Sequence, residues 1–315
     1  MRIRLLLAGV LVCQGAIGQG LPQALFEIKE IDLHLHAGME REVDLDAWLD
    51  MAVKDGRRVV ALVDHLELYR KTEAEYREWR ADRRFAEYPL GSAGHRAVMA
   101  EFARAAGRKD VITFRGWEIY EGELDTGFET DPMRMADVIG WHISPNHGGE
   151  PPDGRKLIRR ARQILEAQKQ FPIPMVLFHP FTMRLEHLQR AAQKKGRDPK
   201  SLTAAEYRFF RPGEQDELIR ALKGTSVYIE ISRSTGGYFR NTPCREALIA
   251  DIRPLADAGL QFTISTDNHS VASAEQPFEP IRYCEALGIT PANTNGIIRE
   301  LLTLRAKAGL VYTKH

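Results

Sequence analysis

Seven short runs of apolar and β-branched residues recur along the chain, each with the length and composition of a buried β-strand. They lie at Phe26–His36, Val59–Asp64, Val111–Glu118, Asp137–Ile143, Ile173–His179, Val227–Ser232 and Gln261–Ser265. Between most of them, apolar residues recur at the spacing of one face of an α-helix. Helices are predicted at Leu45–Asp55, Ala97–Ala106, Leu157–Gln168, Glu214–Leu222 and Arg245–Ala258. This alternation predicts an α/β fold with a parallel sheet, either a barrel or a doubly wound sheet.

Two connections are too long to be simple crossovers between neighbouring strands. Residues 66–94 and 181–212 are charged and contain short helical patterns. Long excursions of this kind often form lids or binding loops. We therefore expect a single domain, residues 21–315, that carries these two insertions.

The first twenty residues have a pattern of their own. Arg2 and Arg4 precede the nine apolar residues Leu5–Cys13, and small residues follow up to position 20. This arrangement is typical of a secretory signal peptide, and nine apolar residues are too few for a membrane span, which needs about 20. Residues 1–20 therefore predict export, to the periplasm or by secretion. A lipid anchor at Cys13 is less favoured, because Val12 before it is bulkier than a lipoprotein cleavage site usually allows.

Charge gives little indication of a macromolecular partner. The 315 residues include 44 Lys and Arg against 43 Asp and Glu, which is a formal net charge of +1. This balance gives no general electrostatic reason to expect nucleic acid. Nucleic acid could still bind through one local group of basic residues, but such a group is usually a solvated face, so this partner is not favoured. The group consists of Arg184, Arg190, Lys194, Lys195, Arg197 and Lys200.

The cysteines exclude two kinds of organisation. Cys13, Cys244 and Cys284 are too few for a disulfide framework or a thiolate zinc site. Outside the cytosol Cys244 and Cys284 could pair with each other. The sequence decides neither this pairing nor the oligomeric state.

The candidate chemistry lies where the predicted strands end. Six of the seven runs end in residues that bind divalent metals. In chain order these are His34 and His36, Asp64 and His65, Glu118, His142, His179, and Asp267 and His269. Side chains alternate along a strand, so His34 and His36 share one face, whereas Asp64 and His65 diverge and only one of them should be a ligand.

Each of these residues alone has an ordinary structural explanation. A single histidine at a strand end is more often a hydrogen-bonded structural residue, and Glu118 or Asp267 alone could cap a helix. The shared position of the whole set favours a site, because the carboxyl ends of barrel strands converge on one rim. Burying so many of these groups without a metal would leave unpaired charge. The pattern therefore predicts a multinuclear site for Zn, Mn or Fe, since imidazole and carboxylate without thiolate suit these metals.

The ordered motifs also resemble a known family. Asp-Leu-His34-Leu-His36, Val-Asp64-His65, Gly-Trp-Glu118, Gly-Trp-His142, Phe-His179-Pro and Thr-Asp267-Asn-His269 are similar to the successive motifs of the PHP (polymerase and histidinol phosphatase) superfamily. The resemblance runs from Phe26 to about Ser270. It implies a distorted (β/α)7 TIM-like barrel with two or three metals at the C-terminal rim of the strands, and hydrolysis of phosphoesters.

The resemblance also implies which residues hold which metal. His34, His36, Glu118 and Asp267 would bind the first metal. Glu118 would bridge to a second metal, which His142 and His179 also bind. His65 and His269 would bind a third. The family usually supplies one more His or Asp shortly after the first motif, and in this chain Glu40 or Glu42 would take that place.

The expected activity is metal-dependent phosphoric ester hydrolysis of a small phosphomonoester or phosphodiester. A hydroxide that bridges the metals would attack phosphorus, so no nucleophilic side chain is needed. Arg233 is a candidate to bind a phosphate oxygen, Asp32 and Asp64 to accept hydrogen bonds from the ligand imidazoles, and His147 to donate a proton. The alternatives are hydrolysis of a carboxylic ester, lactone or amide, and a non-catalytic metal- or ligand-binding barrel.

Overall fold

The computed structural model describes residues 26–36, 45–66, 104–127, 133–143, 152–182, 185–269 and 281–308. Several predictions fall outside these residues. They concern the signal peptide at 1–20 with Cys13, the third-metal candidates Glu40 and Glu42, His147, and all but the first residue of the insertion at 66–94.

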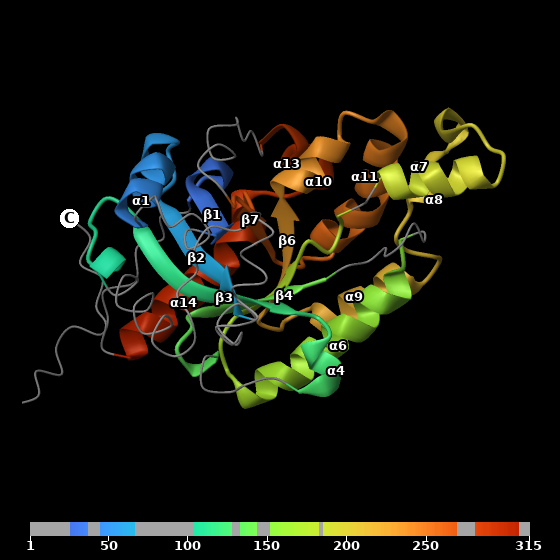
Figure 1. Ribbon diagram of the computed structural model, residues 1–315. Coiled ribbons are helices and arrows are strands. Elements are labelled where there is room, and N and C mark those ends of the chain that lie inside the picture. Colours follow the sequence, from blue (N-terminus) through green and yellow to red (C-terminus); the bar gives the residue numbers. More distant parts are fainter. Residues whose placement is uncertain are drawn as a thin grey trace, which may run out of the picture.

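Seven parallel strands form a single sheet in the order of the sequence (Figure 1). They are β1 (Ile31–Leu35), β2 (Val59–His65), β3 (Ile112–Tyr120), β4 (Val138–His142), β5 (Met175–Phe178), β6 (Val227–Ser232) and β7 (Phe262–Ser265). All seven predicted strands are confirmed. Nearly all of their residues are buried, because the barrel interior covers one face and the helices cover the other.

The two edges of the sheet meet at its carboxyl end. Leu35 forms a parallel bridge with Asn268, the backbone N–H of His36 donates to the carbonyl of Asn268 at 3.0 Å, and the N–H of Asp267 donates to the carbonyl of His34 at 2.9 Å. This closure distinguishes a (β/α)7 barrel from the doubly wound sheet that the strand pattern left open. It also sets the segment after β7 directly beside the end of β1.

Helices follow the strands around the outside of the barrel (Figure 1). They are α1 (Leu45–Lys54), α4 (Glu123–Thr126), α6 (Gly154–Gln170), α9 (Glu214–Leu222), α10 (Arg233–Tyr238), α11 (Thr242–Asp257), α13 (Ile281–Leu287) and α14 (Pro291–Lys307). Four of the five predicted helices are confirmed as α1, α6, α9 and α11, and the predicted helix at 97–106 lies almost wholly outside the described residues. None of the predicted helices corresponds to α4, α10, α13 or α14.

The insertion at 181–212 projects from the barrel as an arm (Figure 1). It contains α7 (Leu185–Lys194), the 3-10 helix η3 (Pro199–Ser201) and α8 (Ala204–Tyr207). Its return to the barrel is held by Asp251 of α11, which accepts hydrogen bonds from the backbone N–H of Phe209 at 2.7 Å and from Nε of Arg208 at 2.5 Å. The prediction of a partly helical excursion is therefore confirmed for this segment.

Cys244 of α11 and Cys284 of α13 are both buried free thiols, so the pairing that the sequence left open is not formed. Among the described residues, no helix is long and apolar enough to cross a membrane.

Candidate metal centre

Eight of the predicted ligands converge at the carboxyl end of the barrel. They are His34, His36, His65, Glu118, His142, His179, Asp267 and His269. Their polar atoms fall into four overlapping groups, and within each group the atoms lie within 4.8 Å of one another. The groups are His34–His36–Glu118, His34–His179–Asp267, Glu118–His142–His179 and His36–His65–His269. The side chains therefore form one continuous cluster that receives residues from every strand end except that of β6.

Glu118 lies at the centre of the cluster and is buried. Its Oε2 is 3.2 Å from Nε2 of His65, 3.4 Å from that of His36 and 3.6 Å from that of His34. Its Oε1 faces the other way, at 2.9 Å from Nδ1 of His142 and 3.5 Å from Nδ1 of His179. Each carboxylate oxygen thus faces a different set of imidazoles, as a carboxylate between two metal positions would.

Asp267 divides its two oxygens in the same manner. Oδ1 lies 3.4 Å from Nε2 of His36 and 3.5 Å from Nδ1 of His269, whereas Oδ2 lies 3.2 Å from Nε2 of His179. Asp267 and His179 are also the only described non-glycine residues with positive φ, at 55° and 53°. This left-handed conformation costs about 1–3 kcal/mol per residue and persists where the surroundings impose it, often at functional sites.

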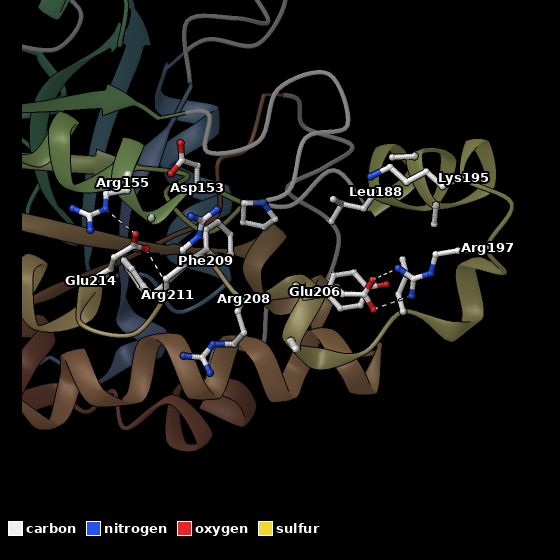
Figure 2. A pocket seen from close by; sticks show the side chains of 18 residues that line it. Asp153, Arg155, Leu188, Lys195, Arg197, Glu206, Arg208, Phe209, Arg211 and Glu214 are labelled. Atoms are coloured by element: carbon white, nitrogen blue, oxygen red, sulfur yellow. Dashed lines mark hydrogen bonds and ion pairs between the residues drawn. The ribbon is translucent and has the colours of Figure 1, made fainter.

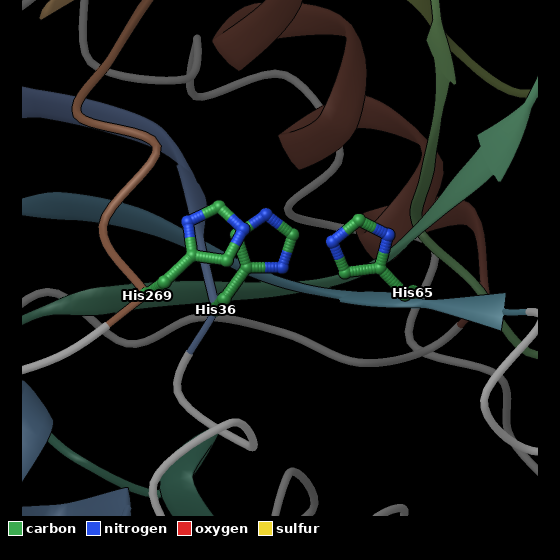
Figure 3. Close-up of side chains that lie close together, drawn as sticks. All are labelled: His36, His65 and His269. Atoms are coloured by element: carbon green, nitrogen blue, oxygen red, sulfur yellow. The ribbon is translucent and has the colours of Figure 1, made fainter. Parts of the chain in front are cut away.

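His36, His65 and His269 form the outer part of the cluster (Figure 3). The ring of His36 lies between the other two, with centroids 4.1 Å from His269 and 4.7 Å from His65. Nδ1 of His269 is fixed by the backbone carbonyl of Asp267 at 3.0 Å. The prediction that only one of Asp64 and His65 joins the cluster is consistent with this arrangement, because His65 contacts Glu118.

The donor atoms fit divalent transition metals. Nε2 of His34 and Nε2 of His36 lie only 2.8 Å apart in a buried position, where two imidazole lone pairs repel each other unless a proton or a cation lies between them. Several buried atoms of the cluster have no hydrogen-bond partner among the described residues. They are Oε2 of Glu118, Oδ1 of Asp267, Nδ1 of His36, and both ring nitrogens of His179. Cations would satisfy these groups.

The electrostatics of the cluster keep several donors in the form that binds metals. Burial alone would raise the pKa of Glu118 and Asp267, but the surrounding imidazoles outweigh it and hold the pKa of both carboxyls well below its usual range. Burial and the neighbouring histidines lower the pKa of His36 well below its usual value. Burial opposes charge on His179 too, yet Asp267 and Glu118 raise its pKa to about 9. A metal bound there would therefore displace a proton.

Glu230, in the middle of β6, was not among the predicted site residues. Its fully buried carboxylate lies 2.7 Å from Nδ1 of His34, and accepts hydrogen bonds from the N–H of His179 at 2.7 Å and from Oγ of Ser265 at 2.6 Å. It therefore orients the His34 ring and holds the strained backbone of His179. A glutamate in the middle of a continuous buried strand was the signal available in the sequence, because an ionisable group there needs buried partners.

An aromatic ring supports His34 from another side. Phe178 of β5 stacks on it, with centroids 3.7 Å apart and 17° between the planes. The neighbouring strand makes room at Gly140, where a Cβ atom would lie 1.7 Å from the Phe178 ring. Gly140 is therefore required by a close approach that positions a predicted ligand.

No imidazole of the described residues donates a hydrogen bond to Asp32, so the prediction for this residue is wrong. Its carboxylate accepts from N–H and Oγ1 of Thr266 at 3.0 and 2.7 Å, and from the N–H of His34 at 3.4 Å. Asp32 of β1 thus holds the start of the segment after β7 by hydrogen bonds, at the point where the barrel closes. Asp64 is buried at the end of β2.

Arg233 begins α10 and donates from Nη1 to the side chain of Asn268 at 2.7 Å. Burial lowers its pKa, and the charged groups with the largest effects on it are Asp32 and Arg57. Neither of these is one of the eight clustered residues. The guanidinium thus braces the segment after β7, and its role as a phosphate ligand remains a prediction.

The cluster is open to solvent on one side. His142, Asp267 and His269 are 33%, 23% and 41% exposed at their side chains. Tyr120 follows on β3 and is among the most exposed large apolar residues, with its ring centroid 6.3 Å from that of His142. His142, His269 and Tyr120 therefore mark the solvent-accessible side of the cluster.

Of the known proteins compared with this chain, only solved structures are similar to it. No family model and no curated protein matches the chain. The chain is similar to a proposed histidinol phosphatase from Listeria monocytogenes, with 13% identity over 78% of this chain and 97% of that chain and a TM-score of 0.47. It is also similar to an adenine deaminase from Arthrobacter aurescens, with 12% identity over 90% of this chain and 91% of that chain and a TM-score of 0.36. A phospho-2-dehydro-3-deoxyheptonate aldolase from Thermotoga maritima gives 13% identity, 89% and 70% coverage and a TM-score of 0.31.

All three TM-scores lie below 0.5. The barrel is therefore assigned from the strand pairing of this chain alone.

Proposed function

We propose that this protein is a metal-dependent hydrolase of the PHP type that cleaves phosphomonoesters or phosphodiesters. The observation that carries the proposal is the position of Glu118, whose two oxygens face separate sets of imidazoles. A buried carboxylate of this kind suits two adjacent divalent metals, and paired metals are typical of phosphoester hydrolysis. The ordered motifs that resemble the PHP superfamily support the same activity.

Two or three divalent metals, Zn, Mn or Fe, would be held by this cluster. Glu118 would be shared, His34, His36 and Asp267 would bind on one side of it and His142 and His179 on the other. His65 and His269 would hold a third ion. When bound, the metals would supply Lewis-acid polarisation of a phosphoryl oxygen and activation of water at neutral pH.

The residues of the chain itself provide orientation. Glu230 fixes the ring of His34 through Nδ1, so Nε2 remains directed into the cluster. The carbonyl of Asp267 does the same for Nδ1 of His269. Because Glu118 is buried while His142 and His269 are partly exposed, the scissile group would enter from the exposed side and meet the shared carboxylate at the base of the site.

The decisive test is turnover on 4-nitrophenyl phosphate and bis(4-nitrophenyl) phosphate. We expect hydrolysis that is abolished by a chelator and restored by manganese or zinc. Hydrolysis of 4-nitrophenyl acetate or a lactone by the reconstituted protein, without hydrolysis of either phosphate, would instead identify a carboxylic ester hydrolase. Full metal content with no turnover on any of these compounds would indicate a binding protein.

Glu40 and Glu42 lie outside the described residues, and their role in a third metal site is part of the proposal. Replacing both by glutamine should remove one metal and leave two. The remaining pair should keep activity at a level about 10–100-fold lower, by analogy with lost support at metal sites. Full metal content and full rate in this double variant would show that the site holds two metals.

Export is likewise proposed from residues 1–20, which lie outside the described residues. N-terminal sequencing of the protein from the extracytoplasmic fraction of an expressing bacterium should show removal of this segment. An intact Met1 on cytoplasmic protein would contradict the proposal.

A further inference from the structure

A cavity of about 830 Å³ separates the arm from the barrel (Figure 2). Its barrel side is formed by the start of α6 and the start of α9, and its other side by α7, by Arg197 and Leu202, and by α8. A volume of this size accommodates a small molecule. None of the eight clustered residues lines it, so it is a separate feature of the molecule.

The chain connects the cavity to the part of the cluster that contains His142 and His179 in two places. The connection after His142 leads to Pro152, which lines the cavity. Phe181, two residues after His179, is buried and packs edge-to-face on Phe209 of the cavity wall, with centroids 5.3 Å apart. Helices that follow barrel strands begin on the face where the strands end. The cavity therefore lies on the same face of the barrel as the cluster.

One wall of the cavity is an apolar stripe that ends in a positive charge. Leu188, Ala191 and Ala192 occupy one face of α7, and Lys195 continues this face one turn further. The two alanines leave space that larger side chains would fill. The stripe suits an apolar segment of a ligand with an anionic group beyond it.

Most other charges around the cavity are already paired. Figure 2 shows Arg155 with Glu214 on one side and Arg197 with Glu206 on the other. Arg208 is paired with Asp251 of α11. Two cations of the lining are left over, since no carboxylate of the described residues lies within 4 Å of the side-chain nitrogen atoms of Lys195 or Arg211. Only the backbone N–H of Arg211 meets a carboxylate, that of Glu214 at 2.8 Å. Among the lining carboxylates, Asp153 caps α6 by accepting from the N–H of Lys156 at 3.2 Å.

We propose that this cavity is the subsite for the part of the substrate that is not hydrolysed, and that it takes an apolar segment bearing a second anionic group, a carboxylate or a phosphate. Lys195 and Arg211 bind that group, and the α7 stripe contacts the apolar segment. This inference rests on the proposed phosphoesterase function and names its substrate class.

The test compares n-alkyl phosphates, from butyl to decyl, with the same compounds bearing a terminal carboxylate or a terminal phosphonate. The series of lengths is needed because the ligand must span from the cluster to the cavity. With the metal-reconstituted protein we expect kcat/KM at the best length to be about tenfold higher for an anionic terminus than for a methyl terminus, as two partly exposed charge contacts would give. The carboxylate and phosphonate arms distinguish the two sources of the anion.

The Lys195→Gln/Arg211→Gln double variant should lose this preference. The matched control is Arg220→Gln/Lys223→Gln, which removes the same charge from exposed positions at the end of α9 and after it, outside the cavity lining. The control should keep the preference. Equal kcat/KM for anionic and methyl termini at every length, in a protein that hydrolyses both, would overturn the cavity proposal and leave the proposed function intact.

Calorimetric titration of the chelator-treated protein with every carboxylated compound of the series provides a readout that does not depend on turnover. Binding that the Lys195→Gln/Arg211→Gln variant loses and the control keeps is the expected result. If no phosphate is hydrolysed, the proposed function is contradicted, and the titration alone then tests the cavity proposal. The cavity proposal is overturned if the compounds do not bind, or if they bind the double variant as well as the native protein.

Discussion

Single carboxylates determine how the histidines of this cluster are arranged. Glu118 contacts five of them, whereas Glu230 contacts two from beneath. Glu118 therefore has the geometry of a ligand shared by two metals. Glu230 lies behind the histidines and orients them without facing the open side of the cluster. Their replacement should have different consequences.

Replacing Glu118 by alanine should remove two metals together, because each of its oxygens faces a separate set of imidazoles. Elemental analysis after dialysis against metal-containing buffer measures this loss. Glu300→Gln serves as the control, since Glu300 accepts a hydrogen bond from Tyr228 at 2.6 Å on the outside of the barrel. A variant that lacks only one metal would show that Glu118 is not shared.

Glu230→Gln should keep the fold but weaken metal binding by about 10–100-fold. The amide accepts only through its single oxygen, so it cannot accept both from Nδ1 of His34 and from the N–H of His179. Competition with a chelator measures the affinity, and Glu300→Gln again provides the matched change of a carboxylate to an amide. Unchanged affinity with intact folding would refute the positioning role.

At the scale of elements, the arm is joined to the barrel through Asp251 of α11. Burial raises the pKa of this carboxyl to about 6, although hydrogen bonds from Phe209 and Arg208 favour its ionised form. A carboxyl whose pKa is raised in the folded state stabilises the fold fully below its unfolded pKa of about 4, and this contribution is lost as the pH rises through about 6.

Asp251→Asn keeps an acceptor for Phe209 but cannot ionise. The free energy of unfolding of the native protein, relative to this variant, should therefore fall by up to about 3 kcal/mol between pH 4 and pH 7. Urea unfolding at several pH values measures the difference. Asp257→Asn, an exposed position on the same helix, should show no such trend. A difference between native protein and Asp251→Asn that is independent of pH would contradict the prediction.

At the scale of the whole molecule, the cluster joins the ends of six strands that are far apart in the sequence. Metals bound there would stabilise the folded barrel, by about 2.7 kcal/mol at a free concentration one hundred times the dissociation constant. Chelation should accordingly lower Tm by about 5–10 °C, and manganese or zinc should restore it. Glu118→Ala should respond much less to the chelator. A Tm that chelation leaves unchanged in the native protein would contradict a metal centre in this position.

The sequence by itself determined the strands, four of the helices that follow them and the eight clustered residues. This was possible because these are local properties: apolar periodicity marks a strand or helix, and a motif such as His34-Leu-His36 at a strand end has its place fixed once the strands are parallel. The (β/α)7 topology came from the resemblance and from the number of alternating elements.

Tertiary structure alone decided the closure of the barrel and the partners of the buried acids. Asp32 contacts Thr266, and Glu230 contacts His34, across more than 190 positions of the sequence. Which of two buried carboxylates reaches an imidazole depends on the stagger of the strands around the barrel. The positive φ of His179 and Asp267 likewise follows from how the strand ends bend to meet one another. These features are set by packing between distant segments, and no local pattern of residues records them.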